Sequence, residues 1–282
     1  MTATGTTLVT GATGTTGSRV AAQLTAAGHH VRAASRHAAP VPGAEPVPFD
    51  WYTPDTHAAA LDGVDCVYLL PPVGDPDPVA VMLPFLRQAR TEGVQRAVLL
   101  SASAVPEGGP AVGKVHQELP GLFGQWAVLR PSWFMQNFTG AHPHAVSIRE
   151  EGAIWTAAGS GRVGFVDADD IAAVAVHALL DAKAPNTELV LTGPEALSYD
   201  DIAATLTQVT GKAVEHHQLS YEQMRERLAA QLPLEFAEML ADMDRAISAG
   251  AEDRVTDTVQ RLTGRPARTF RAVLERELRR SS

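Results

Sequence analysis

The feature that most constrains the fold is a glycine motif near the amino terminus. Gly11, Gly14 and Gly17 stand in "TLVTGATGTTGSRVAAQL", after an apolar β-branched run and at the start of an alanine-rich helical pattern. In a strand–turn–helix unit, such glycines allow a tight turn and let the backbone approach a pyrophosphate closely. The amino terminus of the helix adds N–H donors and a partial positive charge. The motif therefore predicts a dinucleotide site on an α/β sheet.

The rest of the first two thirds of the chain repeats this alternation. Short apolar runs separated by helical segments stand at 6–10, 30–35, 45–49, 66–70, 97–101, 126–130 and 188–193. Strands that alternate with helices of 10–15 residues form crossover units and a parallel sheet covered on both faces. We predict a doubly wound, Rossmann-like parallel sheet.

The pattern changes to helices after residue 195. Ser198 with Asp201, and Ser220 with Gln223, have the spacing of capping boxes that begin helices. We predict a dinucleotide-binding Rossmann domain over 1–155 and a smaller, mostly helical substrate-binding lobe over 156–282. The strand near 188–193 is expected to return to the sheet region.

Charge and cysteine content limit the possible partners. The chain has 282 residues and a net charge of −9, which repels a phosphate backbone and argues against nucleic-acid binding. No uninterrupted run of about 18 apolar residues is present, so we expect no membrane span. A single cysteine, Cys66, excludes an internal disulfide and fits a reducing, cytoplasmic setting. The sequence leaves the oligomeric state open, and we expect no metal site.

The end of the second predicted strand indicates which dinucleotide is bound. An NAD site usually places an acidic residue there to accept a hydrogen bond from the ribose 2′-hydroxyl. This chain has no acidic residue before Glu45, and the strand ends in Ser35 and Arg36. A hydroxyl and a forked cation suit a 2′-phosphate, so we predict NADP(H). A merely solvated Arg36 is the alternative.

Seven motifs together resemble a known family. They are "VTGATGTTG" with "AASR", "FDW" (49–51), "LLPP" (69–72), "LLSASAV" (99–105), "VLRPSWFMQNF" (128–138) and "FVDADDIA" (165–172). The set is similar to the NmrA-like atypical short-chain dehydrogenase/reductases. The tail "VTDTVQRLTGRPARTFRAV" (255–273) resembles a branch with clavine-type iminium reductases and aromatic-polyketide ketoreductases. The resemblance covers nearly the whole chain, and it implies fold more strongly than substrate.

The resemblance implies a set of cofactor-binding residues. Asp50 and Trp51 match positions that flank the adenine, and Ser103 or Ser101 matches the active-site hydroxyl. Alternatively, Trp51 and Phe134 are core aromatics, and the serines bond the end of the fifth strand. The full implied set is Thr10, Gly11, Thr13, Gly14, Thr16, Gly17, Ser35, Arg36, Asp50, Trp51, Leu70, Pro71, Pro72, Ser101, Pro131, Ser132, Trp133 and Phe134.

One family feature is missing. Most short-chain reductases protonate the product with a tyrosine of a Tyr-x-x-x-Lys pair, but this chain has no tyrosine between Tyr68 and Tyr199. Lys114 and His116 are the proton-capable groups near the expected position, and each is equally a plain helix-surface residue. His142 and His144 are further candidates. We take Ser103, His116 and Lys114 as the catalytic candidates.

The missing acid restricts the chemistry. A general acid contributes about 10²–10⁴ in rate, so its loss matters least for acceptors that need no protein-supplied proton. We expect a reductase that transfers hydride to a ketone, quinone-like or iminium carbon of a bulky, polycyclic small molecule. The alternative is an NADP-redox-sensing regulatory protein that binds a protein partner. Methionine suits an irregular ligand or ordinary core filling, and the expected substrate wall is Trp133, Met135, Phe138, Met224, Phe236, Met239 and Met243.

Overall fold

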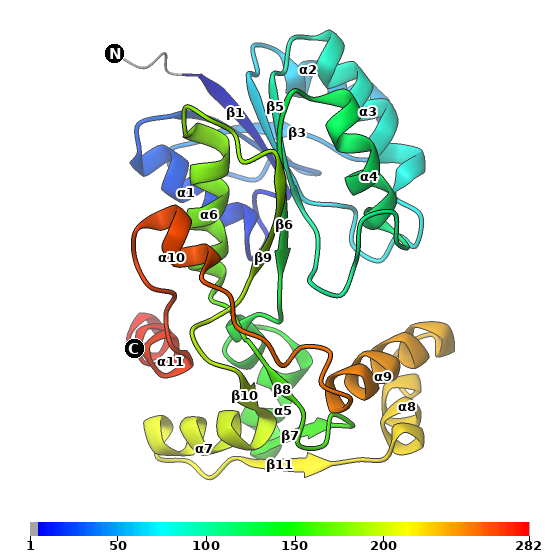
Figure 1. The fold of residues 1–282 in the computed structure, drawn as a ribbon, viewed down its shortest axis with the longest axis vertical. Helices are drawn as coiled ribbons and strands as arrows, with labels where there is room; N and C mark the ends of the chain where they lie inside the picture. The colour runs from blue at the N-terminus through cyan, green and yellow to red at the C-terminus, as the bar shows by residue number, and fades with distance from the viewer. Residues whose placement is uncertain (1–4, 282) are drawn as a thin grey trace. The chain divides into compact units, whose positions relative to one another are not determined.

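The computed structural model describes residues 5–281 and contains a seven-stranded parallel sheet (Figure 1). The strand order is β3-β2-β1-β4-β5-β6-β9, and every neighbouring pair is parallel. This confirms the predicted doubly wound sheet. The strands are β1 (Thr6–Thr10), β2 (His30–Ser35), β3 (Glu45–Pro48), β4 (Cys66–Leu69), β5 (Arg96–Leu100), β6 (Gln125–Pro131) and β9 (Thr187–Leu191).

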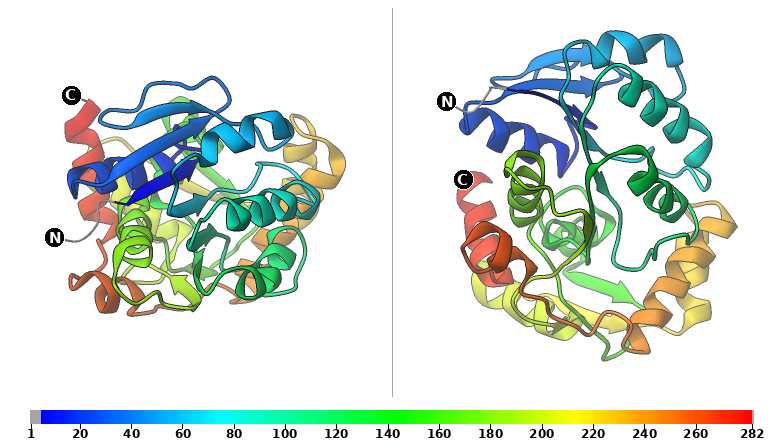
Figure 2. Two further views of the ribbon diagram at one scale, coloured as in Figure 1. Left: turned by 90° about the horizontal axis from the view of Figure 1, so that it is seen from above. Right: turned by 45° about the horizontal axis from the view of Figure 1, so that its top comes forward.

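Helices cover both faces of this sheet, as Figures 1 and 2 show. One layer holds α1 (Gly17–Ala26) and α6 (Ala168–Leu180), with α10 (Thr258–Thr263) packed on α6. The other holds α2 (His57–Leu61), preceded by the short η1 (Pro54–Thr56), and α3 (Val79–Thr91) and α4 (Val112–Leu122). Because both faces are covered, the strands read as continuous apolar runs rather than alternating patterns. All five residues of β5 are buried.

Contacts divide the chain into two units, each made of three segments. The first unit comprises the residues up to Pro131, then Ala168–Leu191 and Thr258–Arg265. The second comprises Ser132–Asp167, Thr192–Asp257 and the residues from Pro266 onward. This division differs from the predicted boundary at 155. Residues 132–155 make their contacts in the second unit because Phe134 bridges to Val166 and β7 (Ala153–Thr156) pairs with β11 (Glu215–Gln218).

The second unit combines helices with two small sheets that the sequence patterns did not reveal. One is the β7–β11 pair, and the strands β8 (Arg162–Val163) and β10 (Leu197–Ser198) form the other. Both expected capping boxes are present, at Ser198 and at Ser220. The remaining elements are η2 (Met135–Phe138), α5 (Pro143–Glu151), α7 (Tyr199–Thr210), α8 (Tyr221–Ala229), α9 (Leu234–Ser248) and α11 (Phe270–Ser281).

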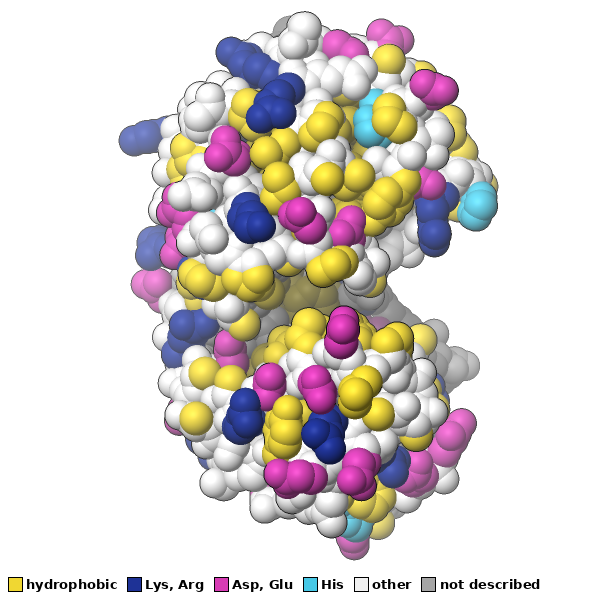
Figure 3. All heavy atoms as spheres, turned by 90° about the vertical axis from the view of Figure 1, so that its right-hand side faces the viewer, with side chains coloured by type: hydrophobic (Ala, Val, Ile, Leu, Met, Phe, Trp, Pro, Cys, Tyr) yellow, Lys and Arg dark blue, Asp and Glu magenta, His cyan; other side chains and the backbone are white. Residues whose placement is uncertain are grey.

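The described surface is mixed in charge. Figure 3 shows one face, on which basic and acidic side chains of the described residues are interspersed rather than gathered by sign. Across residues 5–281, every helix is too short or too polar to traverse a bilayer.

Candidate functional site

The three glycines of the amino-terminal loop have different structural roles. Gly11 adopts a φ of +61°, and a Cβ there would lie 2.3 Å from Cδ2 of Leu70. A Cβ on Gly17 would lie 2.2 Å from the carbonyl oxygen of Gly11, so the close packing of helix on loop excludes any side chain. A Cβ on Gly14 would meet that oxygen at 3.3 Å and Cδ2 of Leu70 at 3.9 Å, with no other heavy atom within 4 Å. The protein itself therefore requires Gly11 and Gly17 more strictly than Gly14.

The loop presents unused backbone donors. Gly14 N–H donates to the Gly11 carbonyl at 2.9 Å, but within residues 5–281 the N–H groups of Thr13, Thr15 and Thr16 find no acceptor. The first turn of α1 carries no acidic side chain that would compete for these donors. Free N–H groups at a helix amino terminus, beside a glycine that leaves room, fit a pyrophosphate. The loop thus fits the phosphates of a dinucleotide.

A buried tyrosine packs beside the glycine loop. Tyr68 on β4 is fully buried with its side chain beside that of Thr16, and burial raises the pKa of its phenol. It therefore stays protonated and cannot serve as an ionised group. Sequence reasoning missed Tyr68 because it reads as one apolar residue of a buried strand.

Arg36 is free to meet a ligand. Its side chain is exposed at the end of β2, and it forms no ion pair or hydrogen bond within the described part of the chain. The Ser35 hydroxyl accepts a hydrogen bond from the N–H of Ala39 at 3.0 Å, which holds the turn after the strand. Arg36 therefore lies in the same unit as the glycine loop, with an unused guanidinium.

The loops that follow β3 and β4 are tied together. The indole N–H of Trp51 donates to the Leu70 carbonyl at 3.1 Å, and the Leu70 N–H donates to the Thr10 hydroxyl at 2.7 Å. The Trp51 ring is 8% exposed and packs edge-on against Phe49 and Phe85. The ring is therefore a core aromatic whose indole N–H reaches the loop after β4. Pro71 and Pro72, which follow Leu70, are partly exposed.

The end of β5 holds a hydroxyl without a partner. The Ser101 oxygen is buried and makes no hydrogen bond with any described residue. Ser103 is also buried, and its N–H donates to the Pro131 carbonyl at 2.8 Å. Both serines follow the carboxyl end of β5, where ligands of doubly wound sheets bind. The orphaned Ser101 oxygen is the stronger sign of a missing ligand.

The two candidate proton donors of α4 lie on opposite sides of the helix. Lys114 is exposed, whereas His116 is 1% exposed. His116 Nε2 lies 3.9 Å from Glu188 of β9, and its Nδ1 is buried without a partner. Burial lowers the pKa of His116, against the attraction of Glu107 and Glu188, so the ring is neutral at pH 7. It packs against the sheet through Trp126 and Glu188 rather than projecting from the helix.

The proposed wall residues of the segment after β6 divide into surface and core. Met135 and Phe138 are 0% and 3% exposed and belong to the apolar core of the second unit. Trp133 and Phe134 are partly exposed. The Ser132 hydroxyl lies 3.2 Å from a carboxylate oxygen of Glu252. Of this segment, Trp133 and Phe134 thus keep surface for a ligand, and Met135 and Phe138 support them from the core.

The helix pair α8 and α9 offers an open apolar face with an acidic border. Phe236 and Met239 are 40% and 44% exposed, Met243 is partly exposed, and Met224 is buried. An open hollow of about 490 Å³ lies over α9, lined by Glu235, Glu238, Met239, Asp242, Met243 and Ala246. Glu238 and Asp242 pair with Arg225 and Arg245 at 3.9 and 2.7 Å.

The histidines of α5 lie in an aromatic cluster. His144 stacks on Phe138, with ring centroids 5.6 Å apart, and lies 5.7 Å from the Tyr199 ring. Burial, with the nearby His142 and His216, lowers the pKa of His144 to about 3. His144 is therefore a neutral packing group rather than a proton donor at pH 7.

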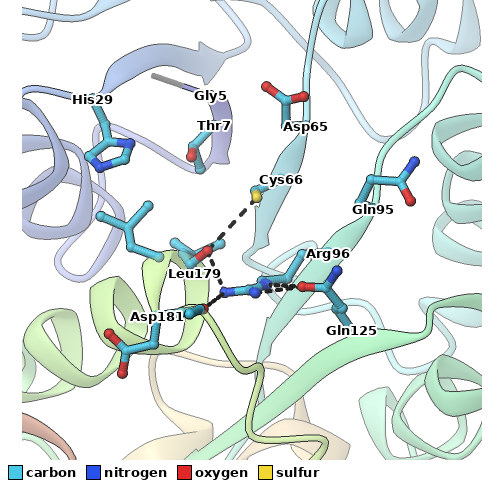
Figure 4. A pocket seen from close by; sticks show the side chains of 12 residues that line it. Gly5, Thr7, His29, Asp65, Cys66, Gln95, Arg96, Gln125, Leu179 and Asp181 are labelled. Carbon is cyan, nitrogen blue, oxygen red and sulfur yellow. Dashed lines mark hydrogen bonds between the residues drawn. The ribbon is translucent and has the colours of Figure 1, made fainter. Parts of the chain in front are cut away.

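Another pocket lies at the amino ends of the strands of the seven-stranded sheet, away from the carboxyl ends that carry the glycine loop. This pocket of about 200 Å³ is lined at the amino ends of β1, β4, β5 and β6 (Figure 4). Arg96 crosses it and donates to the Leu179 and Asp181 carbonyls, both at 2.8 Å, and to Gln125 at 2.9 Å. These donors hold the end of α6 against the sheet, so the pocket is a packing feature and not a nucleotide site.

Comparisons with known proteins agree with this geometry. Residues 11–182 match the NAD(P)H-binding family model, and residues 125–263 match the NmrA-like family model. An uncharacterised oxidoreductase of Bacillus subtilis, YesF, is 47% identical over 93% of this chain and 92% of its own length. Festuclavine synthase II of Penicillium roqueforti is 39% identical over 96% and 97%. The Citrobacter triphenylmethane reductase complexed with NADP(H) shares 25% identity, with a TM-score of 0.79 over 96% and 99%.

Proposed function

Since the chain belongs to the NmrA-like family of NAD(P)H-dependent oxidoreductases, we propose that it is an NADPH-dependent reductase of bulky, polycyclic small molecules. The observation that carries the proposal is the open cradle at Gly14 with its free N–H donors, in one unit with an unpaired Arg36. The glycine loop would bind the pyrophosphate of the dinucleotide. Arg36 would bind a third phosphate group, the 2′-phosphate, which NADPH has and NADH lacks.

The preference for NADPH rests on electrostatics at the end of β2. A planar guanidinium can hold a 2′-phosphate through two parallel hydrogen bonds, whereas it has no anionic partner on a ribose hydroxyl. Calorimetric titration should give a dissociation constant for NADPH at least tenfold below that for NADH. Arg36→Asp should invert the ratio, because the carboxylate accepts from the 2′-hydroxyl and repels the phosphate. Equal affinities in the wild type would remove Arg36 from the site.

The residues after β5 would serve the nicotinamide end. NADPH supplies a hydride when bound. The buried Ser101 oxygen, which lacks a partner among the described residues, supports a hydrogen bond from this loop to the ligand, and the buried Ser103 belongs to the same loop.

The acceptor follows from the absence of an acid. His116 is buried against the sheet, Lys114 is exposed, and the chain has no tyrosine between Tyr68 and Tyr199. Hydride addition to an iminium or another cationic carbon neutralises the acceptor and needs no proton. A quinone spreads its negative charge by resonance and depends on an acid less than a ketone does.

The α9 surface supports a cationic acceptor. Met239 and Met243 offer an adaptable apolar surface, and Glu235 beside them adds a negative charge, whereas Asp242 is already paired with Arg245. Such a surface attracts a flat cation and repels an anion. We therefore place a cationic polycyclic acceptor first, a quinone second and a neutral ketone third.

An acceptor panel tests the proposal. NADPH oxidation is followed with a cationic triphenylmethane dye, a polycyclic quinone and a neutral polycyclic ketone of matched size. We expect the rate to fall in that order. Tight NADPH binding with no turnover of any acceptor would instead favour the regulatory alternative, in which the protein senses the NADP redox state and binds a protein partner.

A further inference from the structure

An exposed aromatic residue stands beside the loop that the resemblance assigns to adenine. Tyr52 follows Trp51 directly and is 60% exposed, whereas the Trp51 ring is buried. The Tyr52 N–H donates to the Asp50 carboxylate at 3.0 Å, which fixes the backbone at the start of its side chain. The loop after β3 therefore presents the Tyr52 ring, and not the Trp51 ring, to solvent or ligand.

The Tyr52 hydroxyl reaches the neighbouring loop. It donates to the Asp75 carboxylate at 2.6 Å, and the other oxygen of that carboxylate accepts the Asp77 N–H at 2.8 Å. The hydrogen bond to Asp75 raises the pKa of Tyr52, which keeps the phenol a donor throughout the neutral range. Asp75 lies in the loop after β4, between Leu70 and α3.

The same two loops are thus tied twice. The inner tie is the Trp51 indole on the Leu70 carbonyl, close to the end of the sheet. The outer tie is the Tyr52–Asp75 hydrogen bond, which is exposed and adds nothing to the core. An exposed hydrogen bond of this kind contributes little to folding. It joins two loops at the carboxyl ends of parallel strands, which is where ligands of such sheets bind, so a role in ligand binding is the better explanation for it.

We propose that Tyr52 and Asp75 form a latch that closes over the adenosine end of the bound dinucleotide and slows its release. The Tyr52 ring supplies an aromatic face for the adenine, and the hydroxyl holds that face in place through Asp75. The latch rests on the proposed nucleotide site. Tyr52 and Asp75 are positioning residues and take no part in hydride transfer.

Three variants separate the ring from the hydrogen bond. Tyr52→Phe keeps the ring and loses the bond, Asp75→Ala removes the acceptor, and Tyr52→Ala removes both functions. Val73→Ser is the matched control, since Val73 lies in the same loop and is 93% exposed. Tyr52 and Val73 are exposed and Asp75 is partly exposed, so the melting temperatures of all four variants should stay near that of the wild type.

The readouts are the dissociation rate of NADPH, by stopped-flow fluorescence, and the affinity for adenosine 2′,5′-bisphosphate, which lacks the nicotinamide half. We expect Tyr52→Phe and Asp75→Ala each to raise the NADPH dissociation rate about three- to tenfold, in line with one net hydrogen bond. The Tyr52→Phe/Asp75→Ala double variant should match Asp75→Ala, because the Tyr52–Asp75 bond is already absent in that single variant. Tyr52→Ala should weaken the bisphosphate by tenfold or more through loss of stacking.

Three results would overturn the latch and can be told apart. Normal NADPH and bisphosphate binding in the wild type, with unchanged dissociation in Tyr52→Phe and Asp75→Ala, would refute the latch alone. Failure of the wild type to bind either ligand would refute the proposed nucleotide site and the latch with it. Additive effects in the double variant would also refute it, because they exclude a shared bond.

Discussion

Replacing Gly14 or Gly17 by alanine separates the requirements of the ligand from those of the fold. The added methyl is the same, but the surroundings differ. At Gly17 the new Cβ would lie 2.2 Å from the Gly11 carbonyl oxygen and 2.7 Å from its carbon, both backbone atoms that cannot rotate away. At Gly14 the nearest atom is that oxygen at 3.3 Å, and the next is the flexible end of Leu70 at 3.9 Å.

The magnitudes follow from these distances. Relief of the Gly17 clash requires a shift of about 1 Å between α1 and the loop, and overpacking of this kind costs about 1–3 kcal/mol. Gly14 needs a shift of a few tenths of an ångström, and its φ lies outside the left-handed region. Alanine there also restricts the unfolded chain, which is worth about 0.4–1 kcal/mol. Gly14→Ala should therefore change the free energy of unfolding by less than about 1 kcal/mol.

Gly14→Ala should affect NADPH binding much more than it affects the free energy of unfolding. In Gly14→Ala the methyl occupies the space that the pyrophosphate needs, so we expect the NADPH dissociation constant to rise at least about 100-fold, or about 2.7 kcal/mol. Urea unfolding and calorimetric titration measure the two effects. Gly121→Ala is the control, because no atom lies within 4 Å of a Cβ there. Wild-type NADPH affinity in a folded Gly14→Ala protein would refute the cradle.

Two further predictions concern the second unit. His144→Phe should reduce acid sensitivity: a folded pKa of about 3 means that the unfolded chain takes up a proton that the native ring refuses. The wild type should thus lose about 2 kcal/mol more than the variant between pH 7.5 and 4.5, in urea unfolding at each pH, and equal losses would contradict the burial of His144. Asp167→Asn should destabilise the second unit by about 3 kcal/mol, because the fully buried carboxylate pairs with Arg268 at 3.0 Å and Arg276 at 2.9 Å. Hydrogen exchange of α11 should accelerate in Asp167→Asn, and unchanged protection would show that this network does not hold the helix.

The sequence predicted the main sheet well because each strand is an apolar run bounded by polar residues. All seven predicted runs overlap strands of the parallel sheet, including β9, which returns to pair with β6. The capping boxes at Ser198 and Ser220 were equally legible, since a cap depends on two residues three positions apart. The small sheets were not legible. β8 and β10 are two residues long, and β11 is the polar run "EHHQ".

Side-chain environments were harder to foresee than elements. Trp51 and Met135 look alike in sequence as apolar members of binding motifs, and the structure packs both into cores. Arg96 opens an apolar strand, and nothing local announces that it binds the end of α6 more than 80 positions later. Such contacts depend on which distant segments meet. By contrast, the glycine loop and Arg36 are local features, so the sequence indicated them directly.

The central claim is that hydride transfer here needs no protein side chain as proton donor. The most direct measurement is kcat with saturating NADPH and a cationic triphenylmethane dye, for the wild type and for Ser103→Ala, Lys114→Ala and His116→Ala. We predict that each variant keeps kcat within about tenfold of the wild type, because the hydride itself neutralises the cationic carbon. A fall of 10²–10⁴ in any one variant, with normal folding and NADPH affinity, would identify a general acid and contradict the claim.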